Sequence, residues 1–187
     1  MKIALLVEGP SDKLTLPILA KKVAPGHSFV ARVLGRGNLL NAEKVFAFVE
    51  YMKGQDNAIR KVLLCVDSEC TPEAELLKIV SPQETKLKRL IKSPLVMYCG
   101  VIHATEAWLA GDASALKLYL NSPNFRSSAA NAVSKACKPK QALAALFDRH
   151  GREFVNTRDN PKLAQGIDVG QLIKTSQSFA RFARLVR

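Results

Sequence analysis

The clearest pattern in the chain is four hydrophobic runs separated by stretches with helical features. Two of these runs, over residues 2–8 and 61–67, are continuously apolar rather than alternating, which is typical of strands buried on both faces of a parallel sheet. The expected strands span residues 2–8, 28–34, 61–67 and 95–102. Strands that alternate with helices predict an α/β fold with right-handed crossovers.

Signals for helix starts lie between these strands. The expected N-caps are Ser11, Asn38 or Asn41, and Thr71, which precedes a proline at the first helical position. The helix that begins at Pro72 is expected to end near Val80, and a second, lysine-rich helix is expected over 81–92. A short helix is expected at 103–112, and Asp112 is favoured as the cap of a helix over 113–120.

After residue 121 the pattern changes to short helical stretches without a strand signal. A chain of 187 residues with 48% hydrophobic residues can bury one sizeable core. We therefore predict a TOPRIM- or Rossmann-like, mostly parallel four-stranded sheet flanked by helices, with a helical C-terminal extension. The predicted division is an α/β core over 1–122 and a basic helical extension over 123–187, packed on that core.

The chain is strongly basic, with a net charge of +12. Residues 138–187 contain ten Lys or Arg and four Asp or Glu, so the positive charge is concentrated towards the C-terminus. This balance indicates a polyanionic partner such as nucleic acid, although a charge that serves only solubility fits the composition as well.

The four cysteines show no Cys-x-x-Cys spacing, and two of them lie inside apolar strand-like runs. They are interpreted as small core residues in a reducing compartment, and no zinc site is expected. No signal peptide or membrane span is recognisable, which predicts a cytoplasmic protein without a membrane partner.

Acidic residues follow three of the expected strands. Because the carboxyl ends of parallel strands meet at one edge of a sheet, these side chains are expected to gather where ligands bind in α/β folds. Carboxylate oxygens are the ligands that hard cations prefer, so the pattern predicts one or two Mg²⁺ or Mn²⁺ ions. The predicted ligands are Glu8, Asp12, Asp67, Glu69 and Glu106. For Asp12, simple complementarity to a helix dipole is an equally good explanation.

Metal ions held by such acids, inside a basic protein, suit the displacement of a phosphodiester. Gly35-Arg36-Gly37 lacks the third glycine of a dinucleotide-binding loop and does not follow the first strand, so a Rossmann cofactor site is not supported.

Three segments resemble the TOPRIM fold, the catalytic module of topoisomerases, DnaG-type primases and OLD-family nucleases. They are Val7–Lys13, Val66–Glu69 and Thr105–Asp112. The segments Glu106–Leu109, Lys138–Lys140 and Ser178–Phe182 further resemble a bacterial family of small stand-alone TOPRIM-like proteins related to OLD-family nucleases.

The TOPRIM resemblance implies catalytic roles for Glu8 and Asp67, and the OLD-type pattern adds Asp12 and Glu106 to the metal-binding acids. Glu69 stands where this pattern usually has aspartate, so its longer side chain changes the reach toward the metal. OLD-type nucleases also use a lysine, for which Lys138 and Lys140 are both candidates, while a solvated helix start explains these two lysines as well.

Two functions agree with this pattern. The first is a Mg²⁺- or Mn²⁺-dependent nuclease, with DNA favoured over RNA as the substrate, for which the family resemblance implies a phage-defence context. The alternative is a non-catalytic TOPRIM-like module that binds nucleic acid or regulates an ATPase partner. The chain has no Gly-x-x-x-x-Gly-Lys-Ser/Thr loop, so ATPase activity would have to come from another protein. A homodimer is left open.

Overall fold

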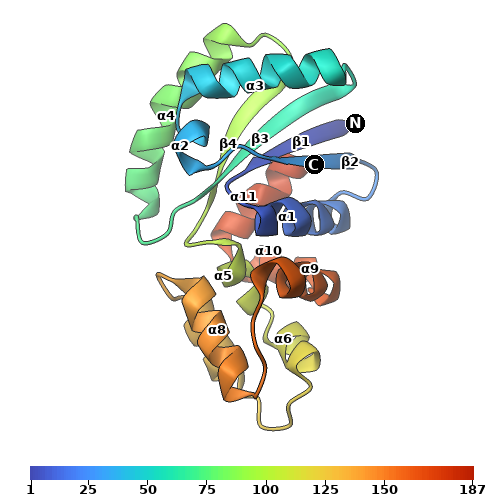
Figure 1. Ribbon diagram of the computed structural model, residues 1–187, viewed down its shortest axis with the longest axis vertical. Helices are drawn as coiled ribbons and strands as arrows, with labels where there is room; N and C mark the ends of the chain where they lie inside the picture. The colour runs from blue at the N-terminus through green and yellow to red at the C-terminus, as the bar shows by residue number, and fades with distance from the viewer.

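A four-stranded parallel sheet forms the centre of the upper lobe in the computed structural model, which describes all 187 residues (Figure 1). The strand order is β2-β1-β3-β4, and every neighbouring pair is parallel. This confirms the predicted fold class. The strands are β1 (Lys2–Val7), β2 (Ser28–Val33), β3 (Ile59–Asp67) and β4 (Leu95–Val101).

The register aligns the carboxyl ends of the strands. Val7 at the end of β1 is paired with Val33 at the end of β2, and Asp67 at the end of β3 is paired with Val101 at the end of β4. The loops that leave all four strands therefore begin at the same edge of the sheet.

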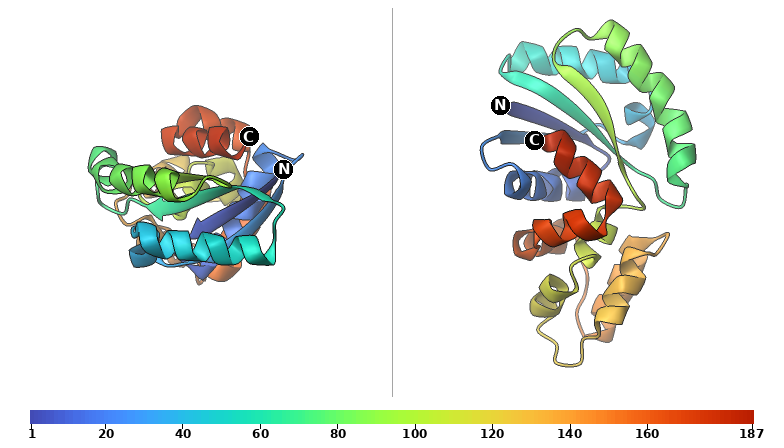
Figure 2. Two further views of the ribbon diagram at one scale, coloured as in Figure 1. Left: turned by 90° about the horizontal axis from the view of Figure 1, so that it is seen from above. Right: turned by 180° about the vertical axis from the view of Figure 1, so that it is seen from behind.

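Helices cover both faces of the sheet. Successive residues of β1 point to opposite faces, so that Leu5 joins one hydrophobic cluster and Leu6 the other. The cluster around Leu6 is closed by α3 (Ala42–Gln55) and α4 (Glu73–Leu90), and the cluster around Leu5 by α1 (Pro10–Val23) and α11 (Gln177–Val186). Figure 2 shows α3 and α11 on opposite sides of the sheet. Burial on both faces explains why the central strands β1 and β3 are continuously apolar.

The remaining helices lie near the carboxyl edge of the sheet. α6 and α8 belong to a lower lobe, whereas α9 packs along α1 and α10 adjoins α11 (Figure 1). One hydrophobic cluster runs from the sheet into these helices, so residues on both sides of position 122 share one core. The division into two parts at this position stays a prediction. The helices are α2 (Arg36–Leu39), α5 (Thr105–Ala110), α6 (Ala113–Leu120), α7 (Ser127–Ser134), α8 (Pro139–Arg149), α9 (Asn156–Gly166) and α10 (Val169–Thr175).

Trp108 of α5 forms the contact between the middle of the chain and its C-terminal helix. Its ring packs edge-on against Phe179 at 5.1 Å between centroids and in a tilted arrangement against Phe182 at 5.3 Å. The indole Nε1 donates a hydrogen bond to Ser178 Oγ at 2.8 Å, which satisfies the one polar group of this buried side chain.

Two sequence-based expectations for helix ends are confirmed. Asn41 caps α3 by accepting a hydrogen bond from Lys44 N–H. Asp112 caps α6 by accepting from the N–H groups of Ser114 and Ala115.

Three expectations about helices were wrong. Ser11 is not an N-cap, because α1 begins one residue earlier at Pro10 and Ser11 is buried inside it. Thr71 is not the cap of α4, since Pro72 occupies that position. The helices expected over 72–80 and 81–92 are one helix, which continues through Pro82 because Leu76, Val80 and Leu87 pack as one stripe on the sheet.

None of the helices combines the length and the apolar composition that spanning a bilayer requires.

Replacing Phe182 by Ala should lower the free energy of unfolding by about 3–5 kcal/mol, because it leaves a cavity beside Trp108 in the main core. Urea unfolding followed by far-UV circular dichroism measures this loss. Arg184→Ala, which removes an exposed side chain from the same helix, is the matched control and should change the free energy by less than about 0.5 kcal/mol. Equal stability of the Phe182→Ala variant and the wild type would contradict the packing described here.

Candidate functional site

A cavity of about 520 Å³ opens at the carboxyl edge of the sheet. It is lined by the loops that follow β1, β3 and β4 and by the N-terminus of α8. All seven site residues expected from the sequence line this one cavity, which we call the acid cavity: Glu8, Asp12, Asp67, Glu69, Glu106, Lys138 and Lys140. The structure brings them together, and their chemical roles stay predictions.

Glu8 connects the ends of the two central strands. Its Oε1 accepts hydrogen bonds from the backbone N–H of Asp67 at 2.9 Å and from the guanidinium of Arg36 at 3.2 Å. Arg36 also donates to the backbone carbonyl of Asp67. The arginine thus places one positive charge against the acids at the strand ends.

Asp12 and Glu106 are held by neutral hydrogen-bond donors. The Asp12 carboxylate accepts from the Thr105 hydroxyl at 2.8 Å, and the Glu106 carboxylate accepts from Asn160 Nδ2 at 2.8 Å. Asn160 is fully buried in α9 and also donates to Ser11 Oγ at 2.9 Å. Its carbonyl oxygen has no partner, so the amide is oriented to present its NH₂ group to Glu106 and Ser11.

Glu69 differs from the other acids because it is exposed and lies in the left-handed region, with φ 49°. His103, with φ 62°, lies beside it. The Glu69 N–H donates to the His103 carbonyl at 2.8 Å, and His103 Nδ1 lies 2.8 Å from the Glu69 carbonyl oxygen. The Ser68 hydroxyl accepts from the His103 N–H at 2.7 Å. The chain therefore turns sharply after Asp67, and Glu69 lines the acid cavity from this turn.

Lys138 and Lys140 belong to the first turn of α8, with Lys138 at the N-cap position. Both are exposed, and neither forms an ion pair within the chain. Their ammonium groups are therefore available to a phosphate in the acid cavity.

Burial, with a smaller contribution from neighbouring negative charges, raises the pKa values of Asp12, Asp67 and Glu8. Burial raises the pKa of Asp12 to about 6, and the Glu106 charge adds to this, whereas the Thr105 hydrogen bond and the Lys140 charge oppose it. Burial, together with the charges of Asp12, Glu8 and Glu106, raises the pKa of Asp67 well above its usual range. Burial also raises the pKa of Glu8, although Arg36 opposes the shift. The ionised form of these carboxylates therefore lowers the stability of the folded protein.

The donor set suits a hard cation, since it consists of carboxylates without cysteine or histidine among the predicted ligands. However, no three side chains of Asp, Glu, His or Cys lie close enough to hold a metal ion as they stand. Three of the acids accept hydrogen bonds from Arg36, Thr105 and Asn160 instead. Joint binding of a metal ion by three or more of these acids therefore requires their side chains to turn.

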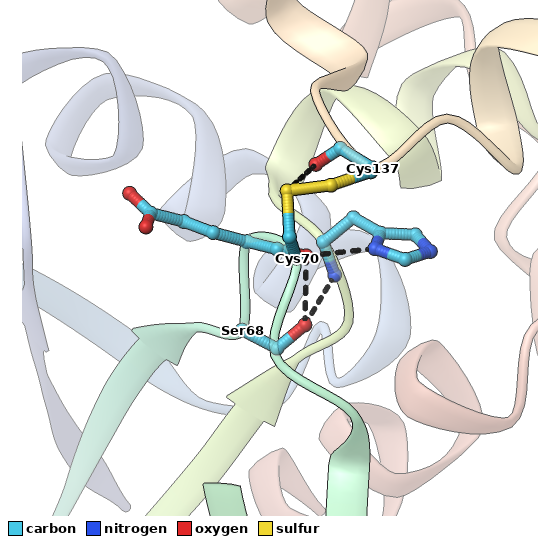
Figure 3. The surroundings of a disulfide bond; sticks show 5 residues. Ser68, Cys70 and Cys137 are labelled. Atoms are coloured by element: carbon cyan, nitrogen blue, oxygen red, sulfur yellow. Dashed lines mark hydrogen bonds between the residues drawn. A yellow bond between two sulfur atoms is a disulfide. The ribbon is translucent and has the colours of Figure 1, made fainter.

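A disulfide crosses the edge of the acid cavity between Cys70 and Cys137 (Figure 3). It joins the loop after β3 to the segment before α8. The interpretation of all four cysteines as free core residues was therefore wrong for this pair, whereas Cys65 and Cys99 are free and buried as expected.

Sequence reasoning missed Arg36, Asn160 and the cysteine pair. Arg36 follows the second strand closely, so the argument from strand ends that selected the acids would also have selected it. Asn160 carries no such signal, since it lies mid-helix and meets Glu106 only through the packing of α9 on α1.

Reduction of the Cys70–Cys137 disulfide should lower the free energy of unfolding by up to about 4 kcal/mol, because the unfolded chain loses a cross-link between residues far apart in sequence. Urea unfolding with and without a dithiol reductant measures the difference. The double variant Cys70→Ser, Cys137→Ser should unfold at one urea concentration under both conditions. An equal urea midpoint of the wild type with and without reductant would contradict a disulfide between Cys70 and Cys137.

Asp12→Asn should stabilise the metal-free protein progressively as the pH rises from about 4 to 6. The folded-state pKa lies above the ordinary value of 3.8, so the folded protein binds more protons in this range and the wild type loses stability as the pH rises. The Asp12→Asn variant does not lose stability in this way, because its amide does not ionise. The difference in the free energy of unfolding amounts to at most about 3 kcal/mol above pH 6. Melting curves in EDTA between pH 4 and 7.5 measure the difference, with exposed Asp148→Asn as the matched control. A difference independent of pH would exclude the raised pKa.

Comparisons with known proteins place the chain in a family. A solved structure, the C-terminal region of the Burkholderia pseudomallei OLD protein, is similar to it at 12% sequence identity, with a TM-score of 0.44 and with 97% of this chain and 98% of that chain covered. No curated protein matches the sequence. The model of one family, described as a domain of unknown function (DUF4276), matches residues 7–187. Because this match spans nearly the whole chain, the protein belongs to the DUF4276 family.

Proposed function

We propose that this protein is a Mg²⁺- or Mn²⁺-dependent nuclease of the TOPRIM type. One observation carries the proposal: acids from three strand ends and two unpaired lysines line the same cavity. Few structural roles would favour burying several like charges together, whereas binding a divalent cation would offset their repulsion.

The arrangement separates a negative region from a positive one. The acids lie at the ends of β1 and β3 and at the start of α5, and the lysines face them from α8. A bound divalent cation would polarise a phosphodiester and stabilise the charge that develops on its oxygens. The residues that would hold this cation are Glu8, Asp12, Asp67, Glu69 and Glu106.

The other side chains would orient the substrate and the acids. Lys138 and Lys140 would meet the non-bridging oxygens of the phosphate at the positive side of the cavity. Arg36 and Asn160 would keep Glu8 and Glu106 directed at the strand ends. The net charge of +12 supports a nucleic-acid substrate. DNA is proposed ahead of RNA as that substrate.

The finer assignments rest on the sequence resemblance. They are membership of the stand-alone TOPRIM proteins related to OLD-family nucleases, a phage-defence context and an ATPase partner. A specific observation favours the non-catalytic alternative, namely that no three acids are close enough to chelate a metal as they stand. In that alternative the protein binds nucleic acid without cutting it.

Asp67→Asn should reduce Mn²⁺-dependent cleavage by at least about 100-fold, because it removes a predicted ligand from the centre of the acid cavity. The assay compares supercoiled, linear and single-stranded DNA and RNA with Mg²⁺ or Mn²⁺. Titration of Mn²⁺ followed by electron paramagnetic resonance should show weaker metal binding by the same variant.

Asp148→Asn, which changes an exposed acid on α8, is the control and should cleave and bind Mn²⁺ like the wild type. Cleavage by Asp67→Asn at the wild-type rate would exclude this site as the catalytic centre. Nucleic-acid binding without cleavage by the wild type would favour the non-catalytic module.

A further inference from the structure

A second cavity, of about 770 Å³, adjoins the acid cavity and shares the side chain of His103 with it. Its walls come from α5, α7, α10 and the starts of α4, α6 and α11. We call it the polar groove. Five exposed side chains in its lining form no hydrogen bond within the chain: Ser114, Ser127, Asn131, Gln171 and Gln177.

The polar groove differs from the acid cavity in its charge. It contains one acid and one lysine, Glu73 and Lys135, and Glu73 is already paired with Arg181 at 3.1 Å. The remaining polar lining is mostly neutral hydroxyls and amides, which both donate and accept hydrogen bonds. Such a lining suits neither a metal ion nor a string of phosphates.

Neutral donors and acceptors in this combination match the edges of nucleobases and the hydroxyls of sugars. Asn and Gln amides can form paired hydrogen bonds with a base edge, and hydroxyls can bond to most edges. Two of the amide side chains, Asn131 and Gln171, come from different helices of the groove. A base between them would meet donors and acceptors from both sides.

We propose that the polar groove binds an unpaired nucleoside next to the phosphate that occupies the acid cavity. This inference rests on the proposed function, which puts that phosphate beside Lys138. The strand would then pass His103, the residue common to both cavities, and enter the groove. The base must be unpaired, because the Watson–Crick edge of a paired base is already hydrogen-bonded to the other strand. Only an unpaired base can turn this edge into a groove between helices.

The groove reads base edges rather than stacking on bases. Trp108 is the one aromatic side chain besides His103 in its lining, and it is only 2% exposed, with its Nε1 bonded to Ser178. Selectivity among bases is therefore expected, since stacking would tolerate any base.

The test is a triple variant in which Asn131, Gln171 and Gln177 are replaced by Ala. Binding of fluorescent single-stranded DNA and RNA is measured by anisotropy in EDTA, so that the result does not depend on cleavage. The dissociation constant should rise about tenfold for both the DNA and the RNA oligonucleotide. This is a modest loss of affinity for the removal of three amide side chains. An abasic strand should bind wild type and variant with similar affinity.

A second measurement separates this inference from the proposed function. Bis(p-nitrophenyl) phosphate is a diester without a nucleoside, and the triple variant should hydrolyse it in Mn²⁺ at the wild-type rate. Loss of this hydrolysis in Asp67→Asn but not in the triple variant would support both proposals. No hydrolysis by the wild type or by any variant would contradict the proposed function. The anisotropy measurement would then decide by itself whether the polar groove binds a nucleoside.

The control replaces three exposed amides that lie outside both cavities, Gln55, Asn57 and Gln165, by Ala. It should bind every strand as the wild type does. Unchanged oligonucleotide binding by the groove variant, or an equal loss in the control, would overturn the proposal. Unchanged melting temperatures will show that both triple variants are folded, as expected for exposed side chains.

Discussion

The hydrogen bond from the Asp67 N–H to the Glu8 carboxylate joins the ends of the two central strands, and the site is built around it. It exists because β1 and β3 are parallel neighbours with their carboxyl ends at one edge. Parallel strands need helical crossovers between them, and these helices bury both faces of the sheet. In an antiparallel pair the two acids would lie at opposite edges of the sheet.

The concentration of acids opposes folding locally, since burial and mutual repulsion raise the pKa values of Glu8, Asp12 and Asp67. The chain offsets this with hydrogen-bond donors of different kinds. Arg36 brings a charge, whereas Thr105 and Asn160 bring neutral donors. The core on both faces of the sheet supplies the stability that allows such a site to persist.

The C-terminal half of the chain contributes to the site as well as to the core. α8 supplies the two lysines, α9 supplies Asn160 against Glu106, and α11 supplies the aromatic rings against Trp108. The disulfide at Cys137 ties this half to the loop that carries Glu69. A site that depends on both halves gives a physical reason for these helices to pack on the sheet.

The sequence by itself determined the four strands, the edge at which the acids gather and the capping by Asp112, and it limited the cap of α3 to Asn38 or Asn41. These features depend on local hydrophobic patterns and on side chains a few residues from the backbone they contact. Only the tertiary structure decided that α4 continues through Pro82, that Glu69 turns out of the strand, and that Asn160 reaches Glu106. It also decided the pairing of Cys70 with Cys137, at a sequence separation of 67. Such contacts arise from the packing of distant elements, which no local pattern encodes.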